Sequence, residues 1–246
     1  MKKAFLIITL LLGATAFGQT ADEIIQKAED HMRGTSSYAE MTVTTIRPKW
    51  QREMKIKSWT KGDDYSVTMV LSPAKDKGTV FLKRDKEIWN YVPSIERTIK
   101  MPPSMLTQSW MGTDMTNDDL VKESSLKKDY TKKILGTETV EGLECYKILL
   151  TPKANVNSIW GKIYIWISKK NYLQLKTRFY DEDNKLVNTI LGKDVKTLGG
   201  KVIPTTMEVI PANKKGQKTR MKYTKAEFNI TVNDEMFTTQ YIKRLK

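Results

Sequence analysis

Three things are scarce in this sequence of 246 residues: it has one cysteine, one histidine and no long apolar run. A single Cys and a single His exclude an intrachain disulfide and a structural zinc site built only from those residue types. The sequence also contains neither a glycine-rich phosphate loop nor a GxSxG nucleophile motif. We therefore expect no metal and no cofactor, and a His-based catalytic site could use only His31.

The longest apolar run covers residues 4–17 and follows a basic Lys2-Lys3 start. Its 14 residues fall short of the roughly 20 that a membrane-spanning helix needs. A basic start, a short apolar segment and small residues at Ala16 and Gly18 are typical of a cleaved signal peptide. The sequence therefore predicts a signal peptide over residues 1–18, a single domain over residues 19–246, and export without a lipid anchor, because no Cys lies near the cleavage point.

Acidic residues are fewer than basic ones, with 28 Asp and Glu against 42 Lys and Arg, so the formal charge is +14. In an exported protein, this charge favours lipid headgroups, acidic glycolipids or acidic protein surfaces as anionic partners, and no nucleic acid is expected. Clustered lysines are also common on solvated strand edges, where they discourage edge-to-edge pairing. Both interpretations stay open from the sequence alone.

The first segment after the signal peptide has a helical pattern. Thr20 and Glu23 have the spacing of a capping box, and apolar residues then recur on one face. These signals predict a helix over residues 21–33 that ends at Gly34, with His31 in its last turn.

From residue 37 onward the apolar period changes to two, and Gly, Pro and Asp turns separate the segments. The first predicted strand begins at residue 37. The strands predicted after it are residues 50–59, 65–71, 79–83, 87–92, 130–135, 144–151, 162–168, 173–180, 186–195, 201–210 and 219–228. About a dozen short strands without a βαβ rhythm predict a mainly β fold (α+β), an antiparallel and strongly curved sheet or barrel. Cys145 lies among apolar strand residues, so we expect it to be a small buried side chain.

Residues 101–112 interrupt the strands, and they are Met-rich and contain Pro102-Pro103. Such a segment cannot be a central strand, and it is either a lid over an apolar ligand or a passive cover of the sheet. A short helix with Thr116 as its N-cap is predicted to follow over residues 114–123. Residues 163–167 are apolar on both strand faces, which indicates a helix on one side and either a cavity or plain core on the other.

Several short motifs occur in one order along nearly the whole chain after residue 18. They are residues 37–41 (SYAEM), 87–93 (EIWNYVP), 96–99 (ERTI), 109–114 (SWMGTD), 118–120 (DDL), 166–173 (WISKKNYL), 179–186 (FYDEDNKL) and 236–238 (MFT). In this order they resemble the LolA-like outer-membrane lipoprotein-sorting protein family. The resemblance implies a half-open antiparallel β-barrel of about 11–12 strands, with an N-terminal helix, short lid helices and an apolar concave side.

The resemblance also implies a function, a periplasmic carrier that binds acyl chains of lipids or lipoproteins and is not an enzyme. An envelope sensor with the same cavity is the alternative, and a hydrolase using His31 is a third hypothesis. We expect a monomer whose protein partners are an inner-membrane exporter or an outer-membrane acceptor. The residues expected to line the cavity and its lid are Trp89, Tyr91, Met101, Met105, Leu106, Trp110, Met111, Tyr164 and Trp166.

Overall fold

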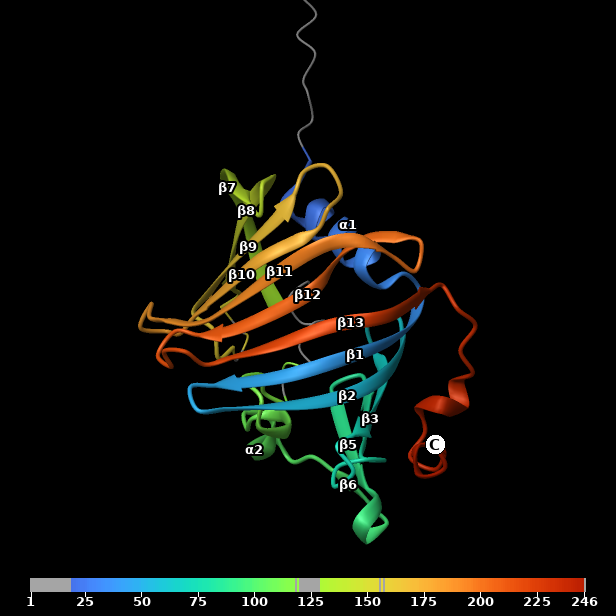
Figure 1. Ribbon diagram of the computed structural model, residues 1–246. Coiled ribbons are helices and arrows are strands. Elements are labelled where there is room, and N and C mark those ends of the chain that lie inside the picture. Colours follow the sequence, from blue (N-terminus) through green and yellow to red (C-terminus); the bar gives the residue numbers. More distant parts are fainter. Residues whose placement is uncertain (1–18, 118, 120–128, 155, 157, 246) are drawn as a thin grey trace, which may run out of the picture.

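The computed structural model describes residues 19–117, 119, 129–154, 156 and 158–245 (Figure 1). The predicted signal peptide and most of the predicted helix after Thr116 lie outside the described residues. The described residues form one antiparallel sheet of 13 strands in the order β6-β5-β4-β3-β2-β1-β13-β12-β11-β10-β9-β8-β7. The edge strands β6 and β7 are not paired with each other in this part of the chain, so the sheet is curved but open. The predicted half-open barrel is confirmed.

The strands closely follow the predicted segments. Their bounds are β1 (Ser36–Arg47), β2 (Trp50–Lys61), β3 (Tyr65–Ser72), β4 (Val80–Arg84), β5 (Glu87–Val92), β6 (Arg97–Lys100), β7 (Tyr130–Val140), β8 (Leu143–Pro152), β9 (Lys162–Ser168), β10 (Gln174–Tyr180), β11 (Leu186–Leu198), β12 (Lys201–Pro211) and β13 (Lys218–Phe228). Two differences from the prediction have a common cause. The short edge strand β6 and the second half of β7 are mostly exposed, so neither has an apolar alternation that the sequence could reveal.

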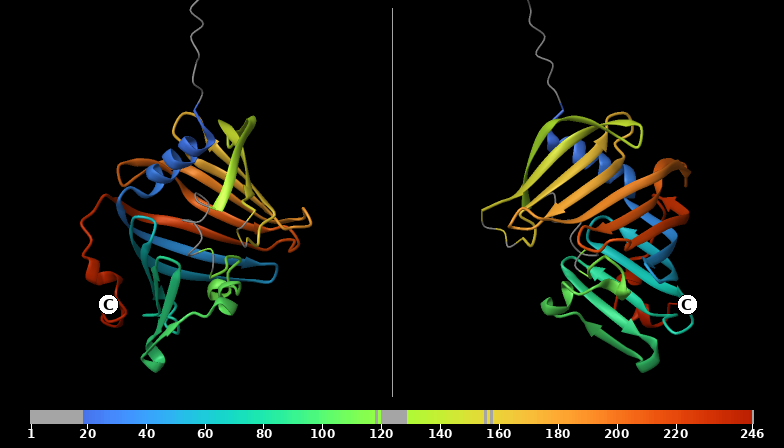
Figure 2. Two further views of the ribbon diagram at one scale, coloured as in Figure 1. Left: turned by 180° about the vertical axis from the view of Figure 1, so that it is seen from behind. Right: turned by 60° about the vertical axis from the view of Figure 1, so that its left-hand side comes forward.

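The N-terminal helix α1 (Ala21–Arg33) lies on the concave side of the sheet (Figure 2). The predicted capping box is present, with the Glu23 N–H donating to Thr20 Oγ1 at 3.2 Å and the Thr20 N–H donating to Glu23 Oε2 at 3.0 Å. Gly34 ends the helix at a φ of 66°, a value that glycine adopts without strain. The apolar face of α1, including Ile24 and Ile25, packs against alternate residues of β9. This packing fixes the helix over one half of the concave face.

The cap at Thr20 makes a stability prediction. Thr20→Ala removes the side-chain acceptor for the Glu23 N–H, so we expect the free energy of unfolding to fall by about 1 kcal/mol. Thr20→Ser keeps the hydroxyl and should retain most of the stability. Urea titration followed by tryptophan fluorescence would measure both variants, and equal midpoints for the two would contradict the prediction.

The convex face of the sheet is covered on one side by the C-terminal segment. The short helices η5 (Asp234–Phe237) and η6 (Tyr241–Lys243) bring Phe237 and Ile242 onto β3 and β4, where both become fully buried against Val67 and Leu82. This segment and α1 therefore occupy opposite faces of the same sheet (Figure 1). No helix in the described part of the chain has both the length and the apolar character to cross a membrane.

Candidate functional site

A cavity of about 320 Å³ lies between α1, the concave face of the sheet and the segment that follows β6. Its volume is at the lower end of the roughly 300–1,000 Å³ found for small-molecule sites. Its walls come from the second half of α1, from β1–β4 and β10–β13, and from Trp110 and Met115 of the covering segment. Helix, sheet and cover thus border a common, partly open space.

The register of the strands arranges the concave wall of this cavity in rows, because directly opposite residues share a face. The row nearest the end of α1 is polar apart from Phe228, and consists of Phe228, Ser37, Thr60, Ser66 and Lys83. The second row is mixed, and consists of Ala226, Ala39, Ser58, Thr68 and Phe81. The third row is apolar apart from one phenol, and consists of Tyr223, Met41, Ile56 and Val70. The fourth row, Met221, Val43 and Met54, is also apolar, but only its Met221 lines the cavity. The cavity therefore has a polar end and an apolar end.

The apolar end is closed by residues 101–117, which we call the lid. It contains α2 (Pro103–Leu106) and the single turn η2 (Trp110–Gly112). Trp110 is 1% exposed and packs edge-on against Phe81, with 5.7 Å between ring centroids. Met101, Met111 and Met115 pack against the same cluster of concave residues. The Met-rich segment predicted from the sequence thus covers the apolar rows.

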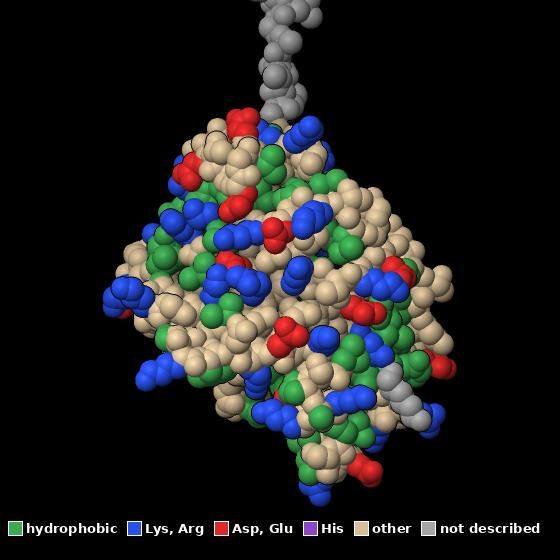
Figure 3. Space-filling model, in the orientation of Figure 1, with side chains coloured by type: hydrophobic (Ala, Val, Ile, Leu, Met, Phe, Trp, Pro, Cys, Tyr) green, Lys and Arg blue, Asp and Glu red, His purple; other side chains and the backbone are tan. Residues whose placement is uncertain are grey.

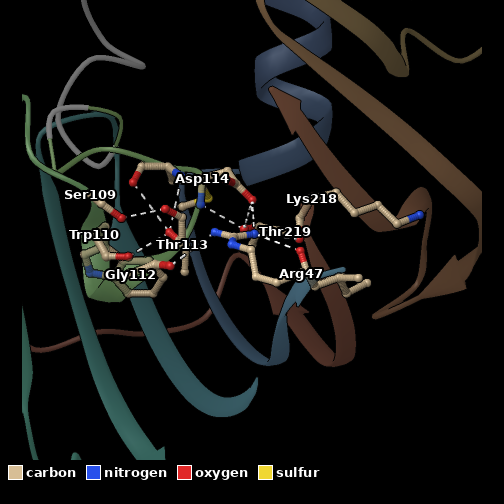
Figure 4. Close-up of polar contacts among 10 residues, drawn as sticks. Arg47, Ser109, Trp110, Gly112, Thr113, Asp114, Lys218 and Thr219 are labelled. Atoms are coloured by element: carbon tan, nitrogen blue, oxygen red, sulfur yellow. Dashed lines mark hydrogen bonds and ion pairs between the residues drawn. The ribbon is translucent and has the colours of Figure 1, made fainter. Parts of the chain in front are cut away.

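An ion pair fixes the lid to the sheet (Figure 4). Arg47 Nη1 at the end of β1 lies 2.9 Å from Asp114 Oδ2, and the two side chains are 13% and 2% exposed. Thr219 of β13 donates its hydroxyl to the same carboxylate oxygen at 2.8 Å and accepts the Asp114 N–H at 2.9 Å. Arg52 donates to the Met111 carbonyl oxygen. One lid carboxylate is therefore held by two neighbouring strands.

The lid also has its own hydrogen bonds. The backbone N–H of Trp110 donates to the Met115 carbonyl oxygen at 2.7 Å, and the Thr113 hydroxyl donates to the Trp110 carbonyl oxygen at 2.7 Å. Thr116 and Asp119 cap each other's N–H groups, as expected for the predicted N-cap. Two buried polar atoms, Trp110 Nε1 and Asp114 Oδ1, have no hydrogen-bond partner among the described residues. The closed lid therefore has internal hydrogen bonds, but two of its buried polar atoms form none.

The polar end of the cavity contains two cations that the sequence analysis missed. Arg33 is the last residue of α1, and Lys83 is the β4 residue of the polar row. Arg33 Nη1 lies 3.7 Å from Asp63 Oδ1, and Lys83 Nζ donates to the Asp63 carbonyl oxygen at 2.6 Å. Lys83 is only 5% exposed. Its two-residue spacing from Phe81 could have placed it on the inner face, but no local pattern links it to Arg33.

Burial lowers the pKa values of both cations. Desolvation lowers the pKa of the Lys83 ammonium to about 8; the Arg33 guanidinium acts in the same direction, and nearby carboxylates including Asp63 oppose it. Desolvation also lowers the pKa of Arg33, against the attraction of Asp63 and the Tyr223 phenol. The polar end is therefore a place where positive charge is costly.

The lid residues expected at the site divide into two groups. Trp110 lines the cavity, and Met101 and Met111 pack against the cluster beneath it. Met105 and Leu106 belong to α2; Met105 is exposed and Leu106 is half-buried, and neither lines the cavity.

Trp89 and Tyr91 do not line the cavity. They share a face, as their spacing predicted, but it is the convex one, because Trp89 pairs with Leu82 and Tyr91 pairs with Val80. There both rings pack with the cluster that includes Phe237 of the C-terminal segment. The sequence did not reveal that this segment would cover the opposite face.

Tyr164 and Trp166 also lie on the convex face, because Ile163, Ile165 and Ile167 are the β9 residues that meet α1. Trp166 is nevertheless buried, since long cationic side chains lie over its ring. The ammonium of Lys176 is 4.6 Å from the ring centroid, and Lys147 and Arg178 lie within 6 Å. Figure 3 shows Lys and Arg side chains interspersed with hydrophobic ones on this face. Aliphatic stems and cation–π contacts, rather than a cavity, explain the strand that is apolar on both faces.

Cys145 and His31, the one cysteine and the one histidine, both lie outside the cavity lining. Cys145 is fully buried, as predicted, and burial raises the pKa of its thiol. His31 lies in the last turn of α1, where Nε2 is 2.7 Å from the Val202 carbonyl oxygen. Among the described residues no three His, Cys, Asp or Glu side chains come together as a metal site.

Comparison with known proteins agrees with this architecture. A DUF1329 family protein from Desulfovibrio piger is 22% identical with a TM-score of 0.81, over 90% of this chain and 97% of that one. A LolA superfamily protein from Nitrosomonas europaea is 22% identical with a TM-score of 0.76, over 91% and 100%. A Vibrio parahaemolyticus domain named for outer membrane lipoprotein sorting is 21% identical with a TM-score of 0.79, over 91% and 98%.

No curated protein matches the chain. A family model described as "Uncharacterized protein" matches residues 62–244, about three quarters of the sequence. The chain therefore belongs to the family that this model represents, and its fold is the LolA-like fold.

Proposed function

We propose that this protein is a periplasmic carrier that binds the acyl chains of lipids or lipoproteins in the cavity under the lid, without catalysing a reaction. The observation that carries the proposal is the partly enclosed space of about 320 Å³ with apolar rows and a Met-rich lid. The predicted signal peptide and the name of the Vibrio parahaemolyticus domain support an envelope role. An inner-membrane exporter or an outer-membrane acceptor would be its partner, with the carrier itself a monomer.

The physical chemistry of the apolar rows suits an acyl chain. Each methylene removed from water contributes about 0.8 kcal/mol, so several methylenes bind without any directed polar contact. Met side chains are flexible and polarisable, and they accommodate chains of different shape. Such an attraction has no chemical trigger, so release depends on opening the lid. The unpartnered Trp110 Nε1 and Asp114 Oδ1 would regain water when the lid opens, which lowers the cost of that movement.

A cavity-filling variant tests the carrier. Ala39→Phe places a large ring in the second row, so we expect saturable binding of a fluorescent fatty acyl probe to be lost. Thr42→Phe is the matched control, because the parity of β1 places residue 42 on the convex face. Lipid extracted from the protein purified from its native host should disappear only in the first variant. If the wild type contains no lipid and binds no probe, the carrier function is wrong.

A further inference from the structure

We propose that the polar end of the cavity binds the anionic head of a single lipid, a carboxylate or a phosphate, through Lys83 and Arg33. This inference rests on the proposed carrier function and names the chemistry of its cargo. It predicts that a free anionic lipid is bound better than an uncharged one, including the uncharged acylated anchor of a lipoprotein.

The two cations converge from different elements. Lys83 projects from β4 in the row of Ser66, and Arg33 comes from the last turn of α1. Both line the cavity, and Asp63 in the turn between β2 and β3 contacts both of them. The contact to Lys83 uses the Asp63 backbone oxygen, so the Asp63 carboxylate pairs with Arg33 and leaves the ammonium with a neutral acceptor. An anion at this end would meet these two cationic side chains and the Asp63 carboxylate, with Asp64 and Asp85 also acting on Lys83 and Glu29 on the cavity wall.

A bound anion would also remove an existing cost. Lys83 is almost fully buried beside another cation, and its lowered pKa means that Asp63, Asp64 and Asp85 offset only part of the cost of its charge. A carboxylate or phosphate oxygen between the two side chains would accept charge-assisted hydrogen bonds from both. The hydroxyls of Ser37 and Thr60, which are 2.7 Å apart, lie in the same row and offer further donors.

The rest of the cavity fits the tail of the same molecule. From the polar row to the row of Met41 and Ile56, the last row of β1 and β2 that lines the cavity, there are two steps of two residues. At ~3.3 Å per residue this is a span of about 13 Å. Head and tail sites are therefore in line, with the cations at one end and apolar rows beyond them, and Trp110 of the lid covers Phe81 in the second row.

Three ligands with one tail separate the contributions. Palmitate, hexadecyl phosphate and hexadecanol carry a carboxylate, a phosphate and an uncharged head. We expect one or both anions to bind roughly 10- to 100-fold more tightly than hexadecanol, as expected for hydrogen bonds to charged groups. Lys83→Met should remove this preference and leave hexadecanol binding unchanged. Lys55→Met, which removes an exposed lysine from β2, should change nothing.

The outcomes are distinguishable. Preference for palmitate alone identifies a fatty acid as the cargo class, and preference for hexadecyl phosphate alone identifies a phosphate head. Equal binding of all three ligands to the wild type overturns this inference and leaves the carrier function standing. If none of the three binds, the carrier function itself fails.

A measurement on the wild type covers the case in which Lys83→Met does not fold. Arg33, Asp63, Asp64 and Asp85 are the charged groups that act on Lys83. Because a bound anion favours the charged ammonium, binding of hexadecanesulfonate at pH 8 should take up about half a proton. Calorimetry in two buffers of different ionisation enthalpy measures this uptake. Binding with no proton uptake would overturn the inference.

Discussion

Replacing Arg47 by methionine is expected to lower the free energy of unfolding by about 3–5 kcal/mol, as is usual when one partner of a buried ion pair is removed. The reason is the position of Asp114, whose side chain is 2% exposed and would keep only the Thr219 hydroxyl as a side-chain partner. Guanidinium chloride titration at pH 7 would measure the loss. A decrease below 1 kcal/mol would show that the lid carboxylate reaches water without unfolding the sheet.

Three further variants separate the ion pair from its surroundings. Asp114→Asn should cost less than Arg47→Met, because Arg47 is 13% exposed and its guanidinium can turn toward solvent. Thr219→Val removes one hydroxyl donor and should cost about 1 kcal/mol. Replacing both members of the pair, in Arg47→Met with Asp114→Leu, should recover much of the loss, since no charge is left buried.

We expect the same pair to control access to the cavity. Asp114 lies between Trp110 and Met115, so a lid released from β1 and β13 would uncover the apolar rows. We expect Arg47→Met to release a bound acyl probe faster than the wild type under conditions where the sheet stays folded. The lid is thus attached by polar contacts at its edge, while its apolar residues pack against the concave cluster.

Local signals in the sequence predicted the fold well. The cap at Thr20, the stop at Gly34 and the period of two each depend on neighbouring residues, and each is confirmed. A covering segment was also predicted, because Pro102-Pro103 excludes a central strand and Met-rich segments cover apolar surfaces. Where the exposed residues of β6 gave no periodic signal, the strand was missed.

The site was predicted less well because it depends on which face of the sheet is inside. For Trp89 and Tyr91 the period of two fixes a shared face, but the chain must be folded before that face is known to meet the C-terminal segment. Trp166 was misplaced for a related reason, since lysine and arginine stems bury it from outside. Arg33 at the end of a helix and Lys83 on a strand lie close together in the fold, although they are 50 residues apart in the sequence. No local spacing in the sequence predicts this proximity.

Glu208 is a further buried charge whose role only the folded sheet reveals. It lies on β12 facing outward, and its side chain is 4% exposed. Three cations surround the carboxylate, with Lys218 at 2.7 Å, Arg220 at 2.9 Å and Lys193 at 3.3 Å. Burial by itself would raise the pKa of Glu208, but the hydrogen bonds from these cations outweigh it and hold the pKa at about 2.

This lowered pKa predicts a pH-dependent stability. An unfolded Glu has a pKa of about 4.3, so the ionised Glu208 stabilises the fold fully above that pH, and the contribution is lost as pH falls toward the folded pKa of about 2. Glu208→Gln should therefore lower the free energy of unfolding by at most about 3 kcal/mol at pH 7. The difference between wild type and variant should shrink between pH 4 and pH 2 (about the two pKa values).

A matched acidic residue shows whether burial is the cause. Glu227 pairs with Lys225 on β13, but the two side chains are 46% and 53% exposed. Glu227→Gln should change the free energy of unfolding by less than about 1 kcal/mol at any pH, because water screens an exposed pair. If both variants lose the same stability, then Lys193, Lys218 and Arg220 stabilise the fold only through the overall charge of the protein, and the burial of Glu208 has no separate effect. A loss confined to Glu208→Gln means that one carboxylate ties β11, β12 and β13 together across the centre of the sheet, where the cavity wall must keep its curvature.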